Sequence, residues 1–202
     1  DDIPGEAQRA IDTAQYGAAD LLVLDVESEF KGRTDAADQL CRLIRDALGP
    51  DYPIYFSSFA IARYHRSFPY ETFRRYCTGA APQVYWNAFR WPLDQSLAWT
   101  YEDYAALGIP ASEVFPVGGL YQEGFVTYPD AEEVRDFNAR AASGGSAGVS
   151  FWSYEHMSDE MWEAVRRGRT GGEEEAEMSS QEYQQVTRAL AEVGARVDRL
   201  EA

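Results

Sequence analysis

The chain has 202 residues, and its hydrophobic fraction of 45% is enough to build a sizeable core. Its 34 acidic residues outnumber 18 basic ones and give a formal net charge of −16. Such a surface repels phosphate backbones, so we expect no nucleic acid partner. No apolar run is long enough to span a membrane and no signal peptide is visible, so we expect no membrane insertion.

Apolar strands alternate with amphipathic helices over the first 167 residues. Strands are expected at 20–26, 53–58, 83–88, 113–117 and 147–153, and helices at 5–17, 34–48, 70–77, 94–107, 129–142 and 158–167. Five consecutive βα units predict an α/β fold with a parallel sheet and right-handed crossovers. A doubly wound sheet and a (β/α)8 TIM barrel both fit this count. The barrel is favoured, because no strand is followed by a G-x-G-x-x-G phosphate loop.

The composition changes after Arg167. Residues 168–179 are acidic and polar, which predicts a flexible linker between a barrel domain at 1–167 and the C-terminal segment 180–202. In that segment apolar residues recur at alternating spacings of 3 and 4, as in a coiled coil that brings copies together, and valine at two d positions favours a trimer. A lone amphipathic helix that packs back on the domain remains the alternative. The seam consists of Tyr183, Val186, Leu190, Val193, Val197 and Leu200.

The stretch LLVLDVESEF, residues 21–30, begins as a buried strand and ends in carboxylates. Asp25 and Glu27 are two residues apart, and alternate residues of an extended segment face the same side, so both can point at one spot. A carboxyl pair of this kind is how most glycosidases supply an acid and its partner. The alternative is an acidic loop that begins where the strand stops.

The other expected strand ends carry aromatic and polar residues of the kind that bind sugars. Rings of Trp and Tyr can stack on sugar faces, although packing in the core explains each of them equally well. The chain has two histidines, and His156 is a better functional candidate than His65. Cys41 and Cys77 are expected to be buried thiols. With so few potential ligands, we expect no metal site and no cofactor. The candidates for stacking are Tyr55, Trp86, Tyr121 and Trp152, and the further candidates for substrate binding are Asn87, Tyr154 and Glu155.

The segments LLVLDVES, PIYFSS, QVYWNAF and AGVSFWSYEHM, in this order, resemble strands four to eight of a glycoside-hydrolase-like TIM barrel. The resemblance is nearest to the lysozyme-type muramidase family and its uncharacterised actinobacterial and phage relatives. It implies that Glu27 is the acid, that Asp25 is its electrostatic partner and that Trp152 lines the sugar site. It covers residues 5–167, and it departs from the muramidase pattern at the last strand, where Ser150, Trp152 and Tyr154 replace an Asp-containing segment.

Three functions follow from these observations. The first is hydrolysis of a cell-wall polysaccharide of the peptidoglycan type. The second is carbohydrate binding without catalysis, and the third is a structural role in an oligomeric assembly such as a phage tail or virion appendage. Each implies an extracellular or virion-associated protein. Because five strands leave two unpaired sheet edges, we also expect an N-terminal segment to complete the barrel.

Overall fold

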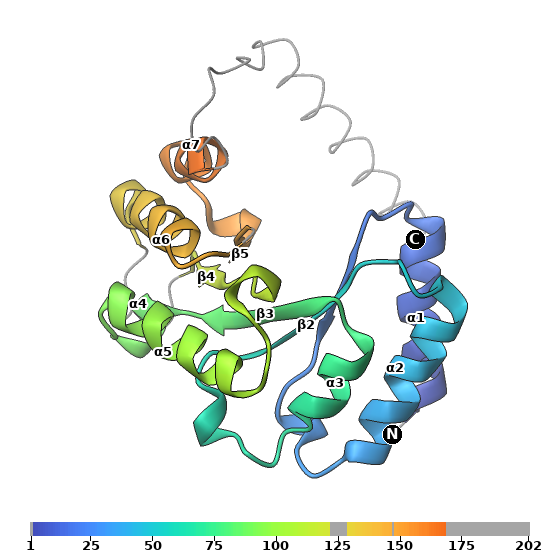
Figure 1. Cartoon of the computed structure of the whole chain (residues 1–202). Helices are drawn as coiled ribbons and strands as arrows, with labels where there is room; N and C mark the ends of the chain where they lie inside the picture. Colours follow the sequence, from blue (N-terminus) through green and yellow to red (C-terminus); the bar gives the residue numbers. More distant parts are fainter. Residues whose placement is uncertain (1, 122–128, 147, 169–202) are drawn as a thin grey trace. The chain divides into compact units, whose positions relative to one another are not determined.

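The computed structural model describes residues 2–121, 129–146 and 148–168 (Figure 1). The strands are β1 (Leu22–Asp25), β2 (Ile54–Phe59), β3 (Gly79–Val84), β4 (Val117–Gly119) and β5 (Ser150–Trp152). The α-helices are α1 (Ile3–Tyr16), α2 (Thr34–Leu48), α3 (Tyr70–Tyr76), α4 (Trp86–Phe89), α5 (Leu93–Ala106), α6 (Ala131–Ser143) and α7 (Asp159–Gly168). Short 3-10 helices follow or precede strands at η1 (Ser28–Phe30), η2 (Ala62–Tyr64), η3 (Ala111–Glu113) and η4 (Tyr154–His156).

The five strands form one parallel sheet whose spatial order is the order of the chain, β1-β2-β3-β4-β5. A doubly wound sheet reverses its strand order at one point, whereas successive strands of a (β/α)8 barrel always lie side by side. The observed order therefore confirms the prediction of a barrel-like α/β fold. In the described residues the sheet is a curled part of a barrel, with β1 and β5 at its two ends.

Side-chain alternation gives β1 one face against the helices and one open face. In β1, Leu22 and Leu24 are buried, whereas Val23 is 48% exposed and Asp25 is also exposed. Leu22 and Leu24 belong to a core that also contains Phe56 of β2 and buried residues of α1, α2 and α3. Burial of this apolar surface stabilises the layer of helices. The opposite, concave face of β1 remains open to solvent.

Two of the predicted strands are displaced along the chain. The third strand was expected at 83–88 but lies at Gly79–Val84, and the residues after it turn into the short helix α4. The fourth was expected at 113–117, whereas β4 covers Val117–Gly119, with a single bridge from Val114 to Ala80 before it. Sheet pairing with β2 stabilises a Gly-Ala-Ala-Pro stretch that has little strand propensity of its own. Tertiary pairing thus overrides the local preference.

Apart from Gly168, which ends α7, the predicted linker at 168–179 and the predicted coiled coil at 180–202 lie outside the described residues. Across the ranges that the structure does describe, none of the helices combines the length and the apolar character needed to cross a membrane.

Arg45 connects the ends of α2 and α3. Its Nη1 donates to the carbonyl oxygens of Gly49 at 3.0 Å, Pro50 at 3.1 Å and Tyr52 at 2.6 Å. Its Nε donates to the carbonyl of Tyr76 at 3.0 Å. Carbonyls at the end of a helix have no partner within the helix, so a half-buried guanidinium that satisfies them fixes the loop before β2.

The two thiols lie at the same contact between α2 and α3. Cys41 is buried in the core and Cys77, at the end of α3, is half-buried, so the prediction of buried thiols holds for Cys41 and in part for Cys77. A hydrogen bond with Cys41, followed by burial, raises the pKa of the Cys77 thiol. The Cys77 sulfur therefore remains protonated in the reduced protein.

Candidate functional site

The two predicted carboxylates lie at the carboxyl end of β1. Asp25 is the last residue of β1 and pairs with Ser57 of β2. The backbone N–H of Val26 donates to the carbonyl of Ser57 at 3.0 Å, which keeps the chain extended beyond the strand. Val26 is buried, whereas Asp25 and Glu27, on either side of it, are exposed and half-buried respectively. The alternation that the sequence predicts therefore extends through this segment.

Gln83, near the end of β3, joins the two carboxylates. Its side-chain Nε2 donates to Asp25 Oδ1 at 3.1 Å and to Glu27 Oε1 at 3.1 Å, with Ser57 Oγ at 3.4 Å. Both carboxylate oxygens accept from one nitrogen, so they cannot be farther apart than twice that distance. Asp25 and Glu27 thus lie side by side at the carboxyl end of the sheet.

Charge crowding at this point changes the acidity of the groups. Burial, followed by the negative charges of Glu27 and Glu29, raises the pKa of Asp25 above its ordinary value, although hydrogen bonds from Ser57 and Gln83 oppose the rise. Burial also raises the pKa of Tyr85, with further contributions from Tyr121, Asp25 and Glu27. Because two close carboxylates ionise together only with difficulty, Asp25 holds its proton more readily than an isolated carboxyl group does.

We expect replacement of Gln83 by leucine to raise the pKa of Asp25 further. The change removes a hydrogen bond that favours the charged carboxylate and adds apolar surface beside it. Glu27→Gln should act in the opposite direction, because it removes the nearest negative charge. Titration of the Asp25 carboxyl carbon by NMR measures both shifts, and the same direction of change in the two variants would contradict this account of the site.

Aromatic and amide side chains gather next to the carboxylates over β4. A Cβ atom at Gly119 would lie 3.1 Å from Asn87 Oδ1 and 3.2 Å from the rings of Tyr85 and Tyr121. The Tyr85 and Tyr121 rings are 5.5 Å apart and nearly perpendicular, and Asn87 Nδ2 donates to the carbonyl of Tyr121 at 3.3 Å. The absence of a side chain at Gly119 is what allows the predicted residues Asn87 and Tyr121 to lie together with Tyr85.

The end of β5 presents exposed aromatic rings. Trp152 is 59% exposed and pairs with Gly119, and Tyr154 is 63% exposed, with its ring perpendicular to that of Trp162. Glu155 is held beside them, because its carboxylate accepts from Ser153 Oγ at 2.5 Å. This hydrogen bond lowers the pKa of Glu155. Exposed rings of this kind can stack on a sugar.

His156 belongs to the same turn. Its Nδ1 lies 2.9 Å from Ser153 Oγ, which also contacts Glu155. His65 is half-buried, with its ring stacked on that of Phe59 at 3.6 Å between centroids. Burial, followed by the charge of Lys31, lowers the pKa of His65. Among residues 2–121, 129–146 and 148–168, no cluster of three or more His, Cys, Asp or Glu side chains could hold a metal ion.

Two of the aromatic residues expected to contact sugar lie elsewhere. Trp86 is only 3% exposed and its ring stacks on Phe137 of α6, so in this structure it presents little surface to a sugar. The cause is the displaced strand, since the chain turns into α4 at Trp86 rather than continuing as a strand. Tyr55 is in register with Val23, below the carboxylates, and packs against Phe115 at 4.8 Å. It is not at the carboxyl end of β2.

Sequence reasoning did not select Gln83, and it placed Ser57 and Tyr85 only among the polar and aromatic residues of the strand ends, not among the site residues. The expected strand began at residue 83, which placed Gln83 at the wrong end of the sheet. The signal that could have found it is the alternation of Ala81, Gln83 and Tyr85 along a strand that begins at Gly79.

Strand order, carboxylates at the strand ends and an open concave face define this chain as a partial TIM barrel with an acidic site. No known family model matches the sequence, and no curated protein matches it. Solved structures do match.

A chitinase, RmChi1 from Rhizomucor miehei, is 14% identical with a TM-score of 0.60, and the match covers 83% of this chain and 74% of that one. The chitinase-like agglutinin RobpsCRA from Robinia pseudoacacia is 13% identical with a TM-score of 0.61, covering 80% and 71%. A glycoside hydrolase family 18 N-acetylglucosaminidase from Paenibacillus barengoltzii is 15% identical with a TM-score of 0.58, covering 80% and 74%. At these identities the likeness concerns the fold, which is of the glycoside-hydrolase TIM-barrel type. None of these three proteins is described as a muramidase, so the likeness supports a glycoside-hydrolase-like fold but not the resemblance to muramidases.

Proposed function

We propose that this protein hydrolyses a polysaccharide, with Glu27 as the general acid and Asp25 as its electrostatic partner. The observation that carries the proposal is the shared amide of Gln83, which holds the two carboxylates side by side at the carboxyl end of the sheet. In TIM barrels that end carries the chemistry.

The proposed reaction uses the crowding of the two carboxylates. Glu27 gives its proton to the glycosidic oxygen while the bond from that oxygen to the anomeric carbon breaks. We propose that the reactive form of the pair has Glu27 protonated and Asp25 ionised, so that Asp25 stabilises the positive charge that develops on the sugar ring. Water then adds to the anomeric carbon and gives a proton back to Glu27. One product has a new reducing end, and the other has a new hydroxyl group at its non-reducing end.

The aromatic rings suggest the substrate class. Tyr85 and Tyr121 border the carboxylates, and Trp152 and Tyr154 extend the aromatic surface at the end of β5. Structural likeness to proteins described as chitinases and as an N-acetylglucosaminidase supports polymers of N-acetylated sugars. Peptidoglycan, which contains the same sugar as chitin, agrees with the sequence resemblance, so cell-wall polysaccharide is the substrate that we propose.

The proposal is tested by the release of reducing ends from purified chitin and peptidoglycan. We expect the full chain to release them from at least one polymer, at a rate well above that of the Glu27→Gln variant. Equal release by both proteins, or none from any polymer of N-acetylated sugars, would contradict hydrolysis.

Carbohydrate binding without turnover is the second candidate. It is favoured by the exposure of Trp152 and Tyr154 and by the likeness to a protein described as a chitinase-like agglutinin. Binding to the same polymers that is lost in Trp152→Ala, retained in Glu27→Gln and accompanied by no release of reducing ends would establish this function instead.

Residues 180–202 are proposed to associate copies of the chain as a coiled coil, with a trimer expected, as a displayed extracellular or virion-associated protein would require. Light scattering of the full chain should give a mass of several copies, and a double Leu190→Asp, Val193→Asp variant should give one copy. A single-copy mass for the unchanged chain would contradict the coiled coil.

A further inference from the structure

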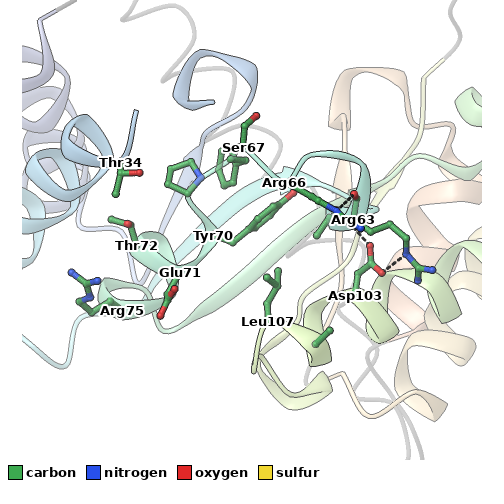
Figure 2. Close-up of a pocket in the computed structure, with 14 residues that line it drawn as sticks. Thr34, Arg63, Arg66, Ser67, Tyr70, Glu71, Thr72, Arg75, Asp103 and Leu107 are labelled. Carbon is green, nitrogen blue, oxygen red and sulfur yellow. Dashed lines mark hydrogen bonds and ion pairs between the residues drawn. The ribbon is translucent and has the colours of Figure 1, made fainter. Parts of the chain in front are cut away.

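A cavity of about 590 Å³ lies on the helical side of the fold, between η2, α3 and α5 (Figure 2). It does not involve the residues of the carboxylate pair or their shared amide. Its wall contains three arginines in a chain that is otherwise strongly acidic. The residues used below are Arg63, Arg66, Tyr70, Glu71, Arg75 and Asp103.

Tyr70 brings a buried hydroxyl group to this cavity. The residue is only 5% exposed, and its ring packs against Phe56, Phe68 and Tyr104. Within the described residues its hydroxyl oxygen has no hydrogen-bond partner. Burial, followed by the charge of Asp103, raises the pKa of Tyr70, so the hydroxyl keeps its proton and remains a donor. Buried polar groups are rarely left without a partner, and each such group calls for an explanation.

The three arginines differ in the ion-pair and hydrogen-bond partners that they already have. Arg63 is neutralised, because its Nε contacts Asp103 Oδ1 at 2.5 Å and its Nη2 contacts Glu102 Oε2 at 2.7 Å. Arg75 has a longer contact with Asp38, at 3.3 Å. Arg66 donates from Nε to the carbonyl of Arg63 at 3.3 Å, and among the described residues no carboxylate pairs with it.

The geometry therefore brings an uncompensated positive charge and an unused donor to one cavity. Figure 2 shows the Tyr70 ring extending toward Arg66. Of the two acids in the wall, Asp103 is held by Arg63, and Glu71 is exposed at the start of α3. A guanidinium and a phenolic hydroxyl together suit an oxygen-rich anion, because both donate hydrogen bonds to it.

We propose that this cavity binds the oxyanion group of a small ligand, a carboxylate or a phosphate, with Arg66 as the charged partner and the Tyr70 hydroxyl as the buried donor. This site is separate from the proposed hydrolytic pair and does not depend on it. In a chain of net charge −16 these local donors, rather than the field of the whole protein, must supply the attraction.

The test is isothermal titration calorimetry, in which inorganic phosphate and, separately, glucuronate are titrated into the full chain at constant ionic strength. We expect saturable binding of at least one of them, and the stronger of the two identifies the anion as phosphate or carboxylate. Tyr70→Phe and Arg66→Gln should each weaken binding by about tenfold or more, as expected for the loss of a hydrogen bond to a charged group.

Matched variants separate this site from general charge effects and from unfolding. Arg42→Gln removes an exposed arginine of α2 that does not line the cavity, and it should leave the affinity unchanged. Glu27→Gln should also leave it unchanged, which distinguishes the site from the hydrolytic pair. Tyr70→Phe should keep the thermal midpoint of the unligated protein, because it removes only an unpaired hydroxyl. Saturable binding of neither anion, or equal weakening by Arg42→Gln, would overturn the proposal.

Discussion

Glu27→Gln should lower the rate of polysaccharide hydrolysis by about 10²- to 10⁴-fold, the usual contribution of a general acid. The amide has nearly the same shape as the carboxyl group, but it cannot give a proton to the leaving oxygen. The hydrogen bond from Gln83 can be kept by the amide oxygen, so the local structure and the affinity for the polymer should change little. A fall in kcat with little change in KM is therefore the expected result.

Glu113→Gln is the matched control for this variant. Glu113 is an exposed carboxylate in η3, before β4 and thus at the opposite end of the sheet from the carboxylate pair. The Glu113→Gln variant loses the same charge as Glu27→Gln, and its rate of hydrolysis should equal that of the unchanged protein. If both variants lost activity equally, the loss would reflect net charge or stability, and Glu27 would not be the acid.

Arg45→Ala should lower the free energy of unfolding by about 3 kcal/mol. The change leaves the carbonyls of Gly49, Pro50, Tyr52 and Tyr76 without their charged donor. Water can replace part of this hydrogen bonding at the surface, so the cost is smaller than the sum of the separate bonds. Urea denaturation followed by circular dichroism measures the difference.

Arg42→Ala and Arg45→Lys complete this comparison. Arg42 lies on the same helix and is exposed, so its replacement should change the stability by less than about 0.5 kcal/mol. Lysine keeps the charge of Arg45 but reaches fewer carbonyls than the guanidinium fork, and it should recover only part of the loss. A stability of Arg45→Ala equal to that of Arg42→Ala would show that the four carbonyls do not depend on this side chain.

The sequence by itself was sufficient for features that depend on neighbouring residues in the chain. It predicted α2 over the range that the structure gives, because helical periodicity and a terminating glycine, here Gly49, are local signals. It predicted that Asp25 and Glu27 face one side, because alternation along an extended segment is a property of the backbone. The repeated βα pattern also predicted a parallel sheet, and the absence of a G-x-G-x-x-G loop favoured a barrel over a doubly wound sheet.

Only the tertiary structure decided features that depend on which segments meet. β3 forms in a Gly-Ala-Ala-Pro stretch because β2 lies beside it, and this pairing carries Gln83 to the carboxylates and turns Trp86 into the core. The same holds for the cavity beside Tyr70, whose wall comes from helices far apart in the chain. Local propensity contains no information about such neighbours, because the free energy of a buried contact belongs to the pair and not to either residue.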